Sequence, residues 1–388
     1  MLSVLMLGPG LGANIETMIE YLNLTNNFKL SLFTDVYKFN ENRFPELKVI
    51  TYNHPNKLIR RFRMLIRMVS VQRHNILMIL GGTNLYETIP AIFLLRYNFL
   101  IFNIWGEAVP RMIADKNKKI PYYLFRFVLN KSNSILCSWF NTYNIICNNY
   151  PQIKEKIFIL DWGLGETITK ENDLQCDFTK QFIESLPYDK MILLNQRSIS
   201  EYNALELQAQ AIKKIVDNHP EIAQRIFFII WQGNNFDKSI YDRLSKFIKE
   251  YSLDSIIRIV LHPYLPESDV AHIIKSADVI VNLVYHDQIS KSIFETMYFQ
   301  KQGLLSDIES YRILNEQYQT QFNLVKLDSN AIAEEIIRLF YLWEKGEQDL
   351  DLLNKRKMVV EEYFNLNTNA YKFDKIITEL YSKYVRKM

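Results

Sequence analysis

The sequence lacks a hydrophobic run long enough to cross a bilayer. Its most apolar window, residues 91–105, is interrupted by Arg96 and Asn98 and is shorter than the about 20 residues that a transmembrane helix needs. The apolar residues 2–7 are too few for a signal peptide, have no basic region before them and run directly into a glycine turn. We therefore expect a soluble, cytoplasmic protein.

Cysteine is also scarce. The three cysteines, Cys137, Cys147 and Cys176, are odd in number and show no metal-ligand spacing. They predict neither a disulfide-stapled extracellular domain nor a cysteine-ligated metal site, and they favour a reducing compartment.

The charge of the chain is nearly balanced as a whole but not along its length. The net charge is +3 over 388 residues, a length that predicts two domains. Residues 1–165 hold 19 lysines and arginines against 10 acids, whereas residues 166–388 hold 27 against 33. The first half should therefore favour an anionic partner, and the two halves should bind different molecules.

Short apolar runs alternate with amphipathic segments along the whole chain, which predicts parallel, doubly wound sheets. A polar stretch without periodicity, 167–189, predicts a linker between two such sets. The expected strands are 2–7, 29–33, 47–51, 75–80, 99–104, 134–138 and 157–160 in the first half, and 190–195, 225–231, 256–260, 277–284, 303–305 and 324–325 in the second.

Two carboxylates flank one strand-to-helix turn in the second half. Asp287 follows the strand 277–284, and Glu295 lies in the helix expected over 293–299, with seven residues between the two acids. In open α/β sheets, ligands bind at the carboxyl ends of strands, and a helix N-terminus there attracts phosphate. Two plainer interpretations stay open: Ser292 and Glu295 can form a capping box, and Asp287 can be a solvated loop residue.

A basic amphipathic helix is expected over 57–67. Arg60, Arg63 and Arg67 recur at i, i+3 and i+7 and form one cationic face. This face can be a solvated surface or can bind anionic lipid headgroups. Nucleic-acid binding is disfavoured because no aromatic residues are interleaved and no known motif is present.

A glycine-rich turn follows the first strand. Gly8, Gly10 and Gly12 stand between that strand and the helix expected from residue 14. The spacing is not that of a dinucleotide-binding motif. The turn can be a plain one, or it can let backbone approach a donor diphosphate or an acceptor.

Several blocks, in order, resemble the GT-B retaining glycosyltransferases of glycosyltransferase family 4, also called glycosyl transferases group 1. The blocks are 105–107 (Trp-Gly-Glu), 157–165, 193–197 and the strand and acid-x7-acid segment at 271–297. The resemblance implies an α/β fold of GT-B type, with two doubly wound Rossmann-like domains facing a central cleft and a C-terminal helix crossing back to the first domain. The implied domains are 1–166 for the acceptor, 167–366 for the nucleotide sugar, and the helix 367–388, which packs on the first domain.

The resemblance also implies roles for individual residues. Glu295 would hold the ribose hydroxyls, and Asp287 the hydroxyls of the donor sugar. Arg197 would contact the phosphates, and Glu107 would orient the acceptor hydroxyl. The remaining donor-binding residues that the resemblance implies are the backbone of Gln288, Ile289 and Ser290 and the base-packing His262 and Tyr264. To these we add, from the residues themselves, the side chain of Lys291 and the turn glycines Gly10 and Gly12.

The sequence departs from the family pattern at three points. The family lysine near Tyr202 and Asn203 is absent, Trp105 replaces a histidine, and Ser290 replaces a glycine. Lys291 can compensate for the missing lysine. Glu107 and His262 can also be ordinary turn residues.

The resemblance implies a retaining hexosyltransferase that uses a UDP- or GDP-linked sugar and acts on a glycan or a lipid-linked glycan in cell-surface polysaccharide or glycoconjugate synthesis. No metal or other cofactor is expected, because Arg197 and the helix end can stabilise the leaving diphosphate. The enzyme would be cytoplasmic and peripheral on the inner face of the plasma membrane, without nucleic acid as a partner. The alternatives are a non-catalytic GT-B subunit, which binds a sugar or a partner enzyme, and a sugar-nucleotide epimerase on the same fold.

Overall fold

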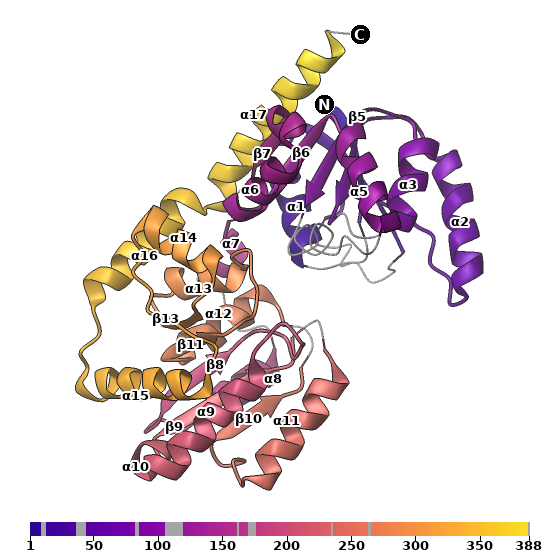
Figure 1. Ribbon diagram of the computed structural model, residues 1–388. Coiled ribbons are helices and arrows are strands. Elements are labelled where there is room, and N and C mark those ends of the chain that lie inside the picture. The colour runs from indigo at the N-terminus through magenta and orange to yellow at the C-terminus, as the bar shows by residue number, and fades with distance from the viewer. Residues whose placement is uncertain are drawn as a thin grey trace. The chain divides into compact units, whose positions relative to one another are not determined.

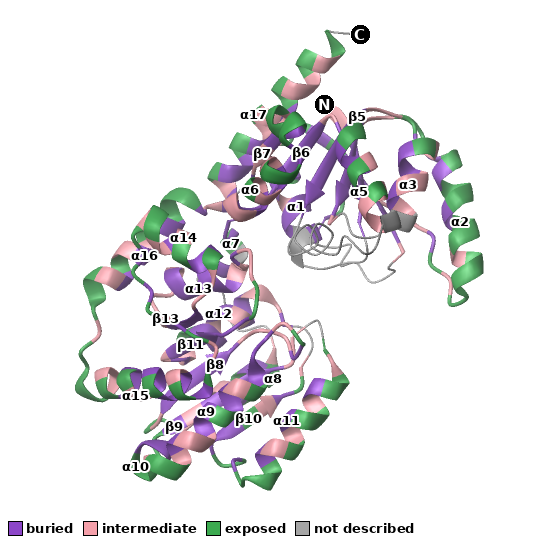
Figure 2. Ribbon diagram, viewed as in Figure 1, coloured by how far each residue is buried: buried purple, intermediate pink, exposed green. Residues whose placement is uncertain are grey.

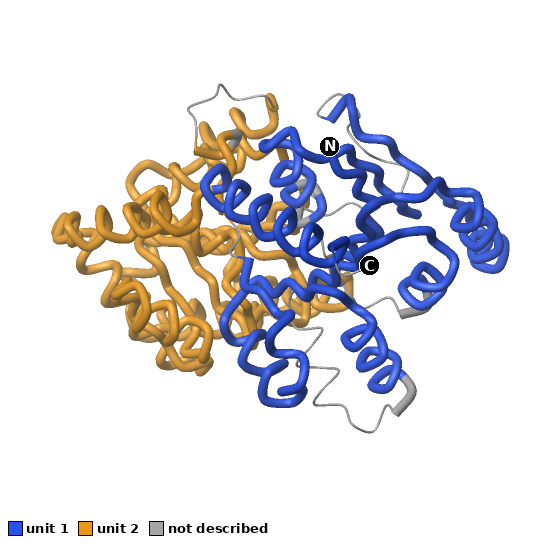
Figure 3. Tube along the Cα trace, turned by 90° about the horizontal axis from the view of Figure 1, so that it is seen from above, with its two compact units in different colours: residues 1–162, 366–388 blue, residues 163–365 orange. Residues whose placement is uncertain are grey.

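The computed structural model describes residues 1–8, 13–35, 44–81, 85–104, 119–160, 163–169, 176–233, 236–262 and 265–386. The chain divides into two compact units (Figure 3). Unit 1 consists of residues 1–162 and 366–388, and unit 2 of residues 163–365. The C-terminal helix therefore belongs to the same unit as the N-terminus.

Unit 1 is built on a seven-stranded parallel sheet with the order β3-β2-β1-β4-β5-β6-β7 (Figure 1). Its strands are apolar and largely buried, as expected of a parallel sheet covered on both faces. They are β1 (Leu2–Leu7), β2 (Phe28–Thr34), β3 (Lys48–Thr51), β4 (His74–Leu80), β5 (Tyr97–Ile104), β6 (Ser134–Cys137) and β7 (Ile157–Ile159).

Helices cover both faces of this sheet because successive strand residues point to opposite sides. Leu5 and Leu77 pack on one face with α2 (Lys57–Ser70), α3 (Leu85–Leu94), α5 (Lys119–Lys131) and α6 (Phe140–Asn149), while Val4 and Ile76 pack on the other with α1 (Ala13–Leu24) and α17 (Leu366–Val385). The 3₁₀ helix η1 (Pro151–Lys156) precedes β7. Tyr21 of α1 meets Phe373 of α17 edge to face at 6.4 Å.

Unit 2 repeats the architecture with a six-stranded parallel sheet in the order β10-β9-β8-β11-β12-β13. Its strands are β8 (Met191–Asn195), β9 (Ile226–Trp231), β10 (Ile257–Val260), β11 (Val279–Asn282), β12 (Gln302–Ser306) and β13 (Leu324–Val325). Its helices are α7 (Glu166–Thr169), α8 (Asp177–Glu184), α9 (Leu205–Asn218), α10 (Pro220–Ala223), α11 (Lys238–Glu250), α12 (Glu267–Ser276), α13 (Lys291–Tyr298), α14 (Glu309–Tyr318), α15 (Ser329–Lys345) and α16 (Leu350–Tyr363).

The predicted α/β class and all of the predicted strands are confirmed. Figure 2 shows why the strands were recognisable: buried residues run along both sheets, whereas each surface helix is buried on one side only. The predicted linker 167–189 is wrong, because much of it forms α7 and α8. Phe182 of α8 packs in the core of unit 2. The helix was not recognised in the sequence because the residues around Phe182 are mostly polar.

The structure also tests the expectation that the chain has no transmembrane helix. Among the described residues, none of the helices combines the length and the apolar character that crossing a membrane requires.

Candidate functional site

In the sheet of unit 2 the order of the strands reverses at the centre, between β8 and β11. Strands β8 and β11 are neighbours there, although β9 and β10 lie between them in the sequence. The chain leaves β8 toward one edge of the sheet and reaches the other edge through β11. Such a topological switch point, at the carboxyl ends of the strands, is where open α/β sheets bind ligands. Arg197 follows β8 and Asp287 follows β11, so the topology brings both predicted residues to this point.

The loop after β8 is fastened on both sides. The N–H of Ile199 donates to the carbonyl of Gln232 after β9, at 2.9 Å. On the other side, the N–H of Tyr285 after β11 donates to the carbonyl of Tyr202, at 3.0 Å. These bonds hold Arg197 on a rigid frame rather than on a free loop.

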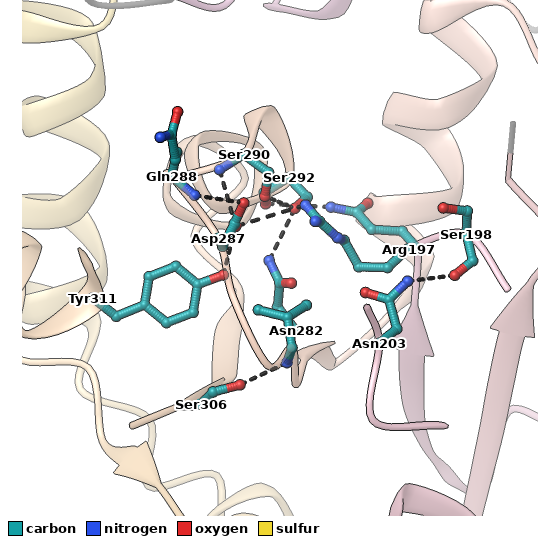
Figure 4. A network of polar contacts seen from close by, with 12 residues as sticks. Arg197, Ser198, Asn203, Asn282, Asp287, Gln288, Ser290, Ser292, Ser306 and Tyr311 are labelled. Carbon is teal, nitrogen blue, oxygen red and sulfur yellow. Dashed lines mark hydrogen bonds and ion pairs between the residues drawn. The ribbon is translucent and has the colours of Figure 1, made fainter. Parts of the chain in front are cut away.

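Gly233 makes this fastening possible. Its φ is +64°, and a Cβ placed there would lie 2.6 Å from the Cα of Ser198. Only glycine allows both the left-handed backbone and this close approach of the two loops. The side chain of Asn203 adds a further bond, to the carbonyl of Ser198 (Figure 4).

Asp287 is held by four groups. Its Oδ1 accepts the N–H of Gln288 at 2.9 Å, and its Oδ2 accepts the N–H of Ser290 at 3.1 Å and the hydroxyl of Tyr311 at 2.7 Å. The guanidinium of Arg197 lies 3.7 Å from Oδ2. Figure 4 shows Tyr311 and Arg197 approaching the carboxylate from opposite sides. Asp287 is therefore an organised residue of the turn and not a solvated loop residue.

Tyr311 is buried in α14 and has no exposed surface. Burial first, and then the neighbouring Asp287 carboxylate, raise the pKa of Tyr311 well above its usual value. Its hydroxyl therefore stays protonated and donates to Asp287 at every physiological pH. Nothing in the sequence pointed to this residue, because α14 itself was not expected.

The turn between Asp287 and α13 differs from the predicted phosphate cradle. Two of the three predicted N–H donors, those of Gln288 and Ser290, are directed at the Asp287 carboxylate. Ile289, between them, is buried and has a φ of +61°. A β-branched residue in this region is strained, and such strain is typical of functional turns.

Glu295 is buried in α13, and its partner is a side chain from the loop after β8. The amide of Gln196 donates to Glu295 Oε2 at 3.2 Å. Burial raises the pKa of Glu295 to about 7, although the nearby Lys291 charge opposes this rise. The helix begins at Lys291 with Ser290 as its N-cap, so the capping box of Ser292 and Glu295 is wrong: Ser292 lies inside the helix.

A chain of hydroxyl and amide groups connects the end of β11 with the start of α13. Ser290 Oγ and Ser292 Oγ are 2.6 Å apart, and the amide of Asn282 donates to Ser292 Oγ at 2.9 Å. The hydroxyl of Ser290 makes no capping bond to the helix N–H groups. The positive end of α13 is therefore not capped by its own N-cap side chain.

Four buried polar atoms at this edge of the sheet have no hydrogen-bond partner within the described part of the chain. They are Gln196 Oε1, Asn203 Oδ1, Asn282 Oδ1 and His262 Nδ1. Buried polar groups are nearly always paired, so these four atoms have hydrogen-bonding capacity left for water or a ligand. Asn282, a buried amide at the end of an apolar strand, could have been recognised from the sequence.

Lys291 and His262 both contact protein groups. The ammonium of Lys291 forms an ion pair with Glu267, the first residue of α12. The ring of His262 stacks on the ring of Phe178 of α8, with 4.5 Å between the centroids. The backbone carbonyl of His262 accepts the indole N–H of Trp231 at 2.9 Å. His262 thus belongs to an aromatic cluster at the carboxyl ends of β9 and β10. Its predicted neighbour Tyr264 lies outside the described residues.

The predicted residues of unit 1 are described only in part. Glu107, Gly10 and Gly12 lie outside the described residues. Arg60, Arg63 and Arg67 lie on α2, and the guanidinium of Arg60 is 3.5 Å from the carboxylate of Asp35 at the end of β2. Over the ranges that the structure describes, no group of three or more His, Cys, Asp or Glu residues is arranged to hold a metal ion.

Comparison with known proteins gives a likeness of structure but not of sequence. No protein-family model and no curated protein matches the sequence. A glycosyltransferase from Rickettsia africae is similar at a TM-score of 0.73 and 14% identity, over 98% of each chain. Sucrose-phosphate synthase from Thermosynechococcus elongatus has a TM-score of 0.74 and 12% identity, over 99% of this chain and 100% of that one. HepE from Anabaena, in complex with UDP and glucose, has a TM-score of 0.75 and 10% identity, over 98% and 100%.

Proposed function

We propose that this chain, which has the GT-B fold, is a retaining glycosyltransferase whose unit 2 binds a nucleoside-diphosphate sugar. The observation that supports this most strongly is the arrangement at the switch point, where Arg197 and Asp287 pair beside the N-terminus of α13 with Glu295 in its second turn. Among the structures of similar fold, one is described as a glycosyltransferase and another contains UDP and glucose, which agrees with this proposal.

Arg197 is the group best suited to the diphosphate. A guanidinium presents a planar fork of N–H donors that matches phosphate oxygens, and its charge does not depend on pH. The first-turn N–H groups of α13 and the helix dipole add to the positive field. As the bond from the anomeric carbon to the diphosphate breaks, negative charge grows on the leaving group, and this field stabilises it.

Glu295 is proposed to bind the ribose. A carboxylate can accept hydrogen bonds from both hydroxyls of a vicinal diol, and the amide of Gln196 already fixes its position. Because the pKa of Glu295 is about 7, binding of two hydroxyl donors would favour the ionised form and lower that pKa.

Asp287 is proposed to act in two ways. It shapes the turn and orients Arg197, and it keeps acceptor capacity for the sugar on Oδ1, which accepts a single bond from Gln288. Lys291, next to the same turn, would substitute for the family lysine that this sequence lacks at Tyr202 and Asn203.

Unit 1 is proposed to bind the acceptor, a glycan or a lipid-linked glycan. Its surplus of positive charge favours an anionic acceptor or surface, and Glu107 would orient the attacking hydroxyl. A role in the synthesis of cell-surface polysaccharide or glycoconjugate is consistent with such an acceptor.

Isothermal titration of the intact chain with UDP-glucose and GDP-glucose, together with an assay for released nucleotide, tests the proposal. We expect binding of one donor and slow release of its nucleotide. Arg197→Ala should weaken donor binding to the level of a nucleoside monophosphate and stop nucleotide release, whereas Arg243→Ala, a matched control on α11 of the same unit, should change neither. Failure of the wild-type chain to bind either donor would refute the proposal.

Binding of the donor without hydrolysis or transfer to any acceptor would favour a non-catalytic GT-B subunit. That alternative has one observation in its support, the engagement of both Asp287 oxygens with the protein itself.

A further inference from the structure

Helix α2 is held to unit 1 by very little of its surface. It spans Lys57–Ser70, and only Met64 and Met68 are buried. These two methionines, four residues apart, pack against the core on one face of the sheet. The helix is nonetheless well capped at its N-terminus, because the side chain of Asn56 accepts hydrogen bonds from the N–H groups of Leu58 and Ile59. The helix is therefore formed in advance and presents most of its circumference to the surroundings (Figure 2).

The exposed side of α2 is apolar. Leu58, Phe62, Leu65 and Val69 recur at i, i+4, i+7 and i+11, which places them on one stripe of the helix. In this order, the four residues are 78%, 64%, 37% and 58% exposed. Beside this stripe, Ile59 is 43% and Ile66 is 53% exposed. A group of large apolar residues on one exposed helix face is typical of a surface that binds another protein or a membrane.

Cations border this apolar face on both sides. Arg63 follows Ile59 and Ile66 around the helix, with Arg67 and Arg60 beyond it, and Arg61 borders the stripe on its other side. The helix contains no acidic residue. Arg60 is near Asp35, but Arg63 and Arg67 are exposed.

We infer that α2 lies in the interface of an anionic lipid bilayer, parallel to its plane, with the apolar stripe among the acyl chains and the arginines among the phosphates. An apolar face bordered by cations matches the boundary between acyl chains and anionic headgroups. Met64 and Met68, on the face beyond Arg61, attach the helix to unit 1. This inference is independent of the proposed sugar transfer.

A second copy of the chain is a poorer occupant of the same face. In a symmetric dimer each α2 would cover the other, and the cations that line the two stripes would be brought together. No acid on α2 is present to neutralise them, and like charges at such spacing repel. An anionic membrane supplies the compensating charge that another α2 lacks.

Flotation of the full-length chain with vesicles tests the inference. Vesicles of phosphatidylcholine mixed with phosphatidylglycerol should carry the wild-type protein, and vesicles of phosphatidylcholine alone should carry much less. Arg63→Gln with Arg67→Gln should weaken binding to the anionic vesicles by roughly fivefold for each charge removed. Lys246→Gln with Lys249→Gln, an exposed pair on α11, is the matched control and should leave binding unchanged.

The apolar stripe needs its own variant. Leu58→Ser with Phe62→Ser should abolish flotation while the thermal unfolding temperature stays unchanged, because neither side chain is buried. Leu350→Ser with Met358→Ser on α16, both 64% exposed, is the control and should float as wild type does.

Three results would overturn the inference. One is failure of the wild-type chain to float with anionic vesicles. Another is flotation of the Leu58→Ser and Phe62→Ser variant as complete as that of wild type, which would leave only surface charge. A dimer in light scattering that these two substitutions dissociate would assign the face to a second copy of the chain.

Discussion

Glu295→Gln is the substitution whose effect can be worked out most fully from the structure. Burial raises the pKa of the Glu295 carboxyl from 4.5 to about 7, and the residue is only 7% exposed. A difference of this size corresponds to about 3 kcal/mol between the folded and unfolded chain. Glutamine keeps the shape of the side chain but does not titrate.

The sign of the effect follows from proton binding. Between pH 4.5 and about 7, the folded protein holds a proton on Glu295 that the unfolded chain has lost. Stability therefore falls as the pH rises through this window and levels off above it. In the glutamine variant this contribution is absent.

The assay is thermal unfolding of both proteins from about pH 5 to about pH 8, read as the difference in Tm at each pH. Across the window we expect the Tm of wild type to fall by roughly 10 °C relative to that of Glu295→Gln. A loss of about 3 kcal/mol in unfolding free energy lowers the Tm by that amount in a domain of the size of unit 2. Parallel pH profiles for the two proteins would refute the reasoning, since they would mean that Glu295 titrates as an ordinary carboxyl group.

Two further substitutions test the frame around the candidate site. Tyr311→Phe removes the hydroxyl that donates to Asp287 and should lower the transfer rate about tenfold, with a loss of about 1 kcal/mol in unfolding free energy; an unchanged rate would show that Asp287 needs no such support. Gly233→Ala should destabilise unit 2 by more than 2 kcal/mol or so, because its Cβ would clash with Ser198. Gly346→Ala has a similar φ, +67°, but nothing within 4 Å, so calorimetric unfolding should separate the two, and equal losses would disprove the clash.

The sequence was informative wherever a property is local. The strands were recognisable because their residues are apolar in short runs, and the turn with Asp287 and Glu295 was recognisable because both acids flank one strand-to-helix junction. The positions of Arg197 and Asp287 in neighbouring loops then follow from the order of the strands.

Contacts between distant segments were not predictable in the same way. Tyr311 reaches Asp287 from 24 residues away, on a helix whose pattern was not recognised. Phe178 stacks on His262, although the sequence around it is polar enough to suggest a linker. The use of the Gln288 and Ser290 N–H groups by Asp287 was missed because a backbone donor leaves no trace in the sequence.

The most direct test of the central claim compares UDP with UMP. If Arg197 binds the diphosphate, titration calorimetry should show that wild type prefers UDP to UMP, and that Arg197→Ala loses this preference while its affinity for UMP changes little. A variant that still prefers UDP by the wild-type factor would contradict the assignment of the phosphate site to the switch point of unit 2.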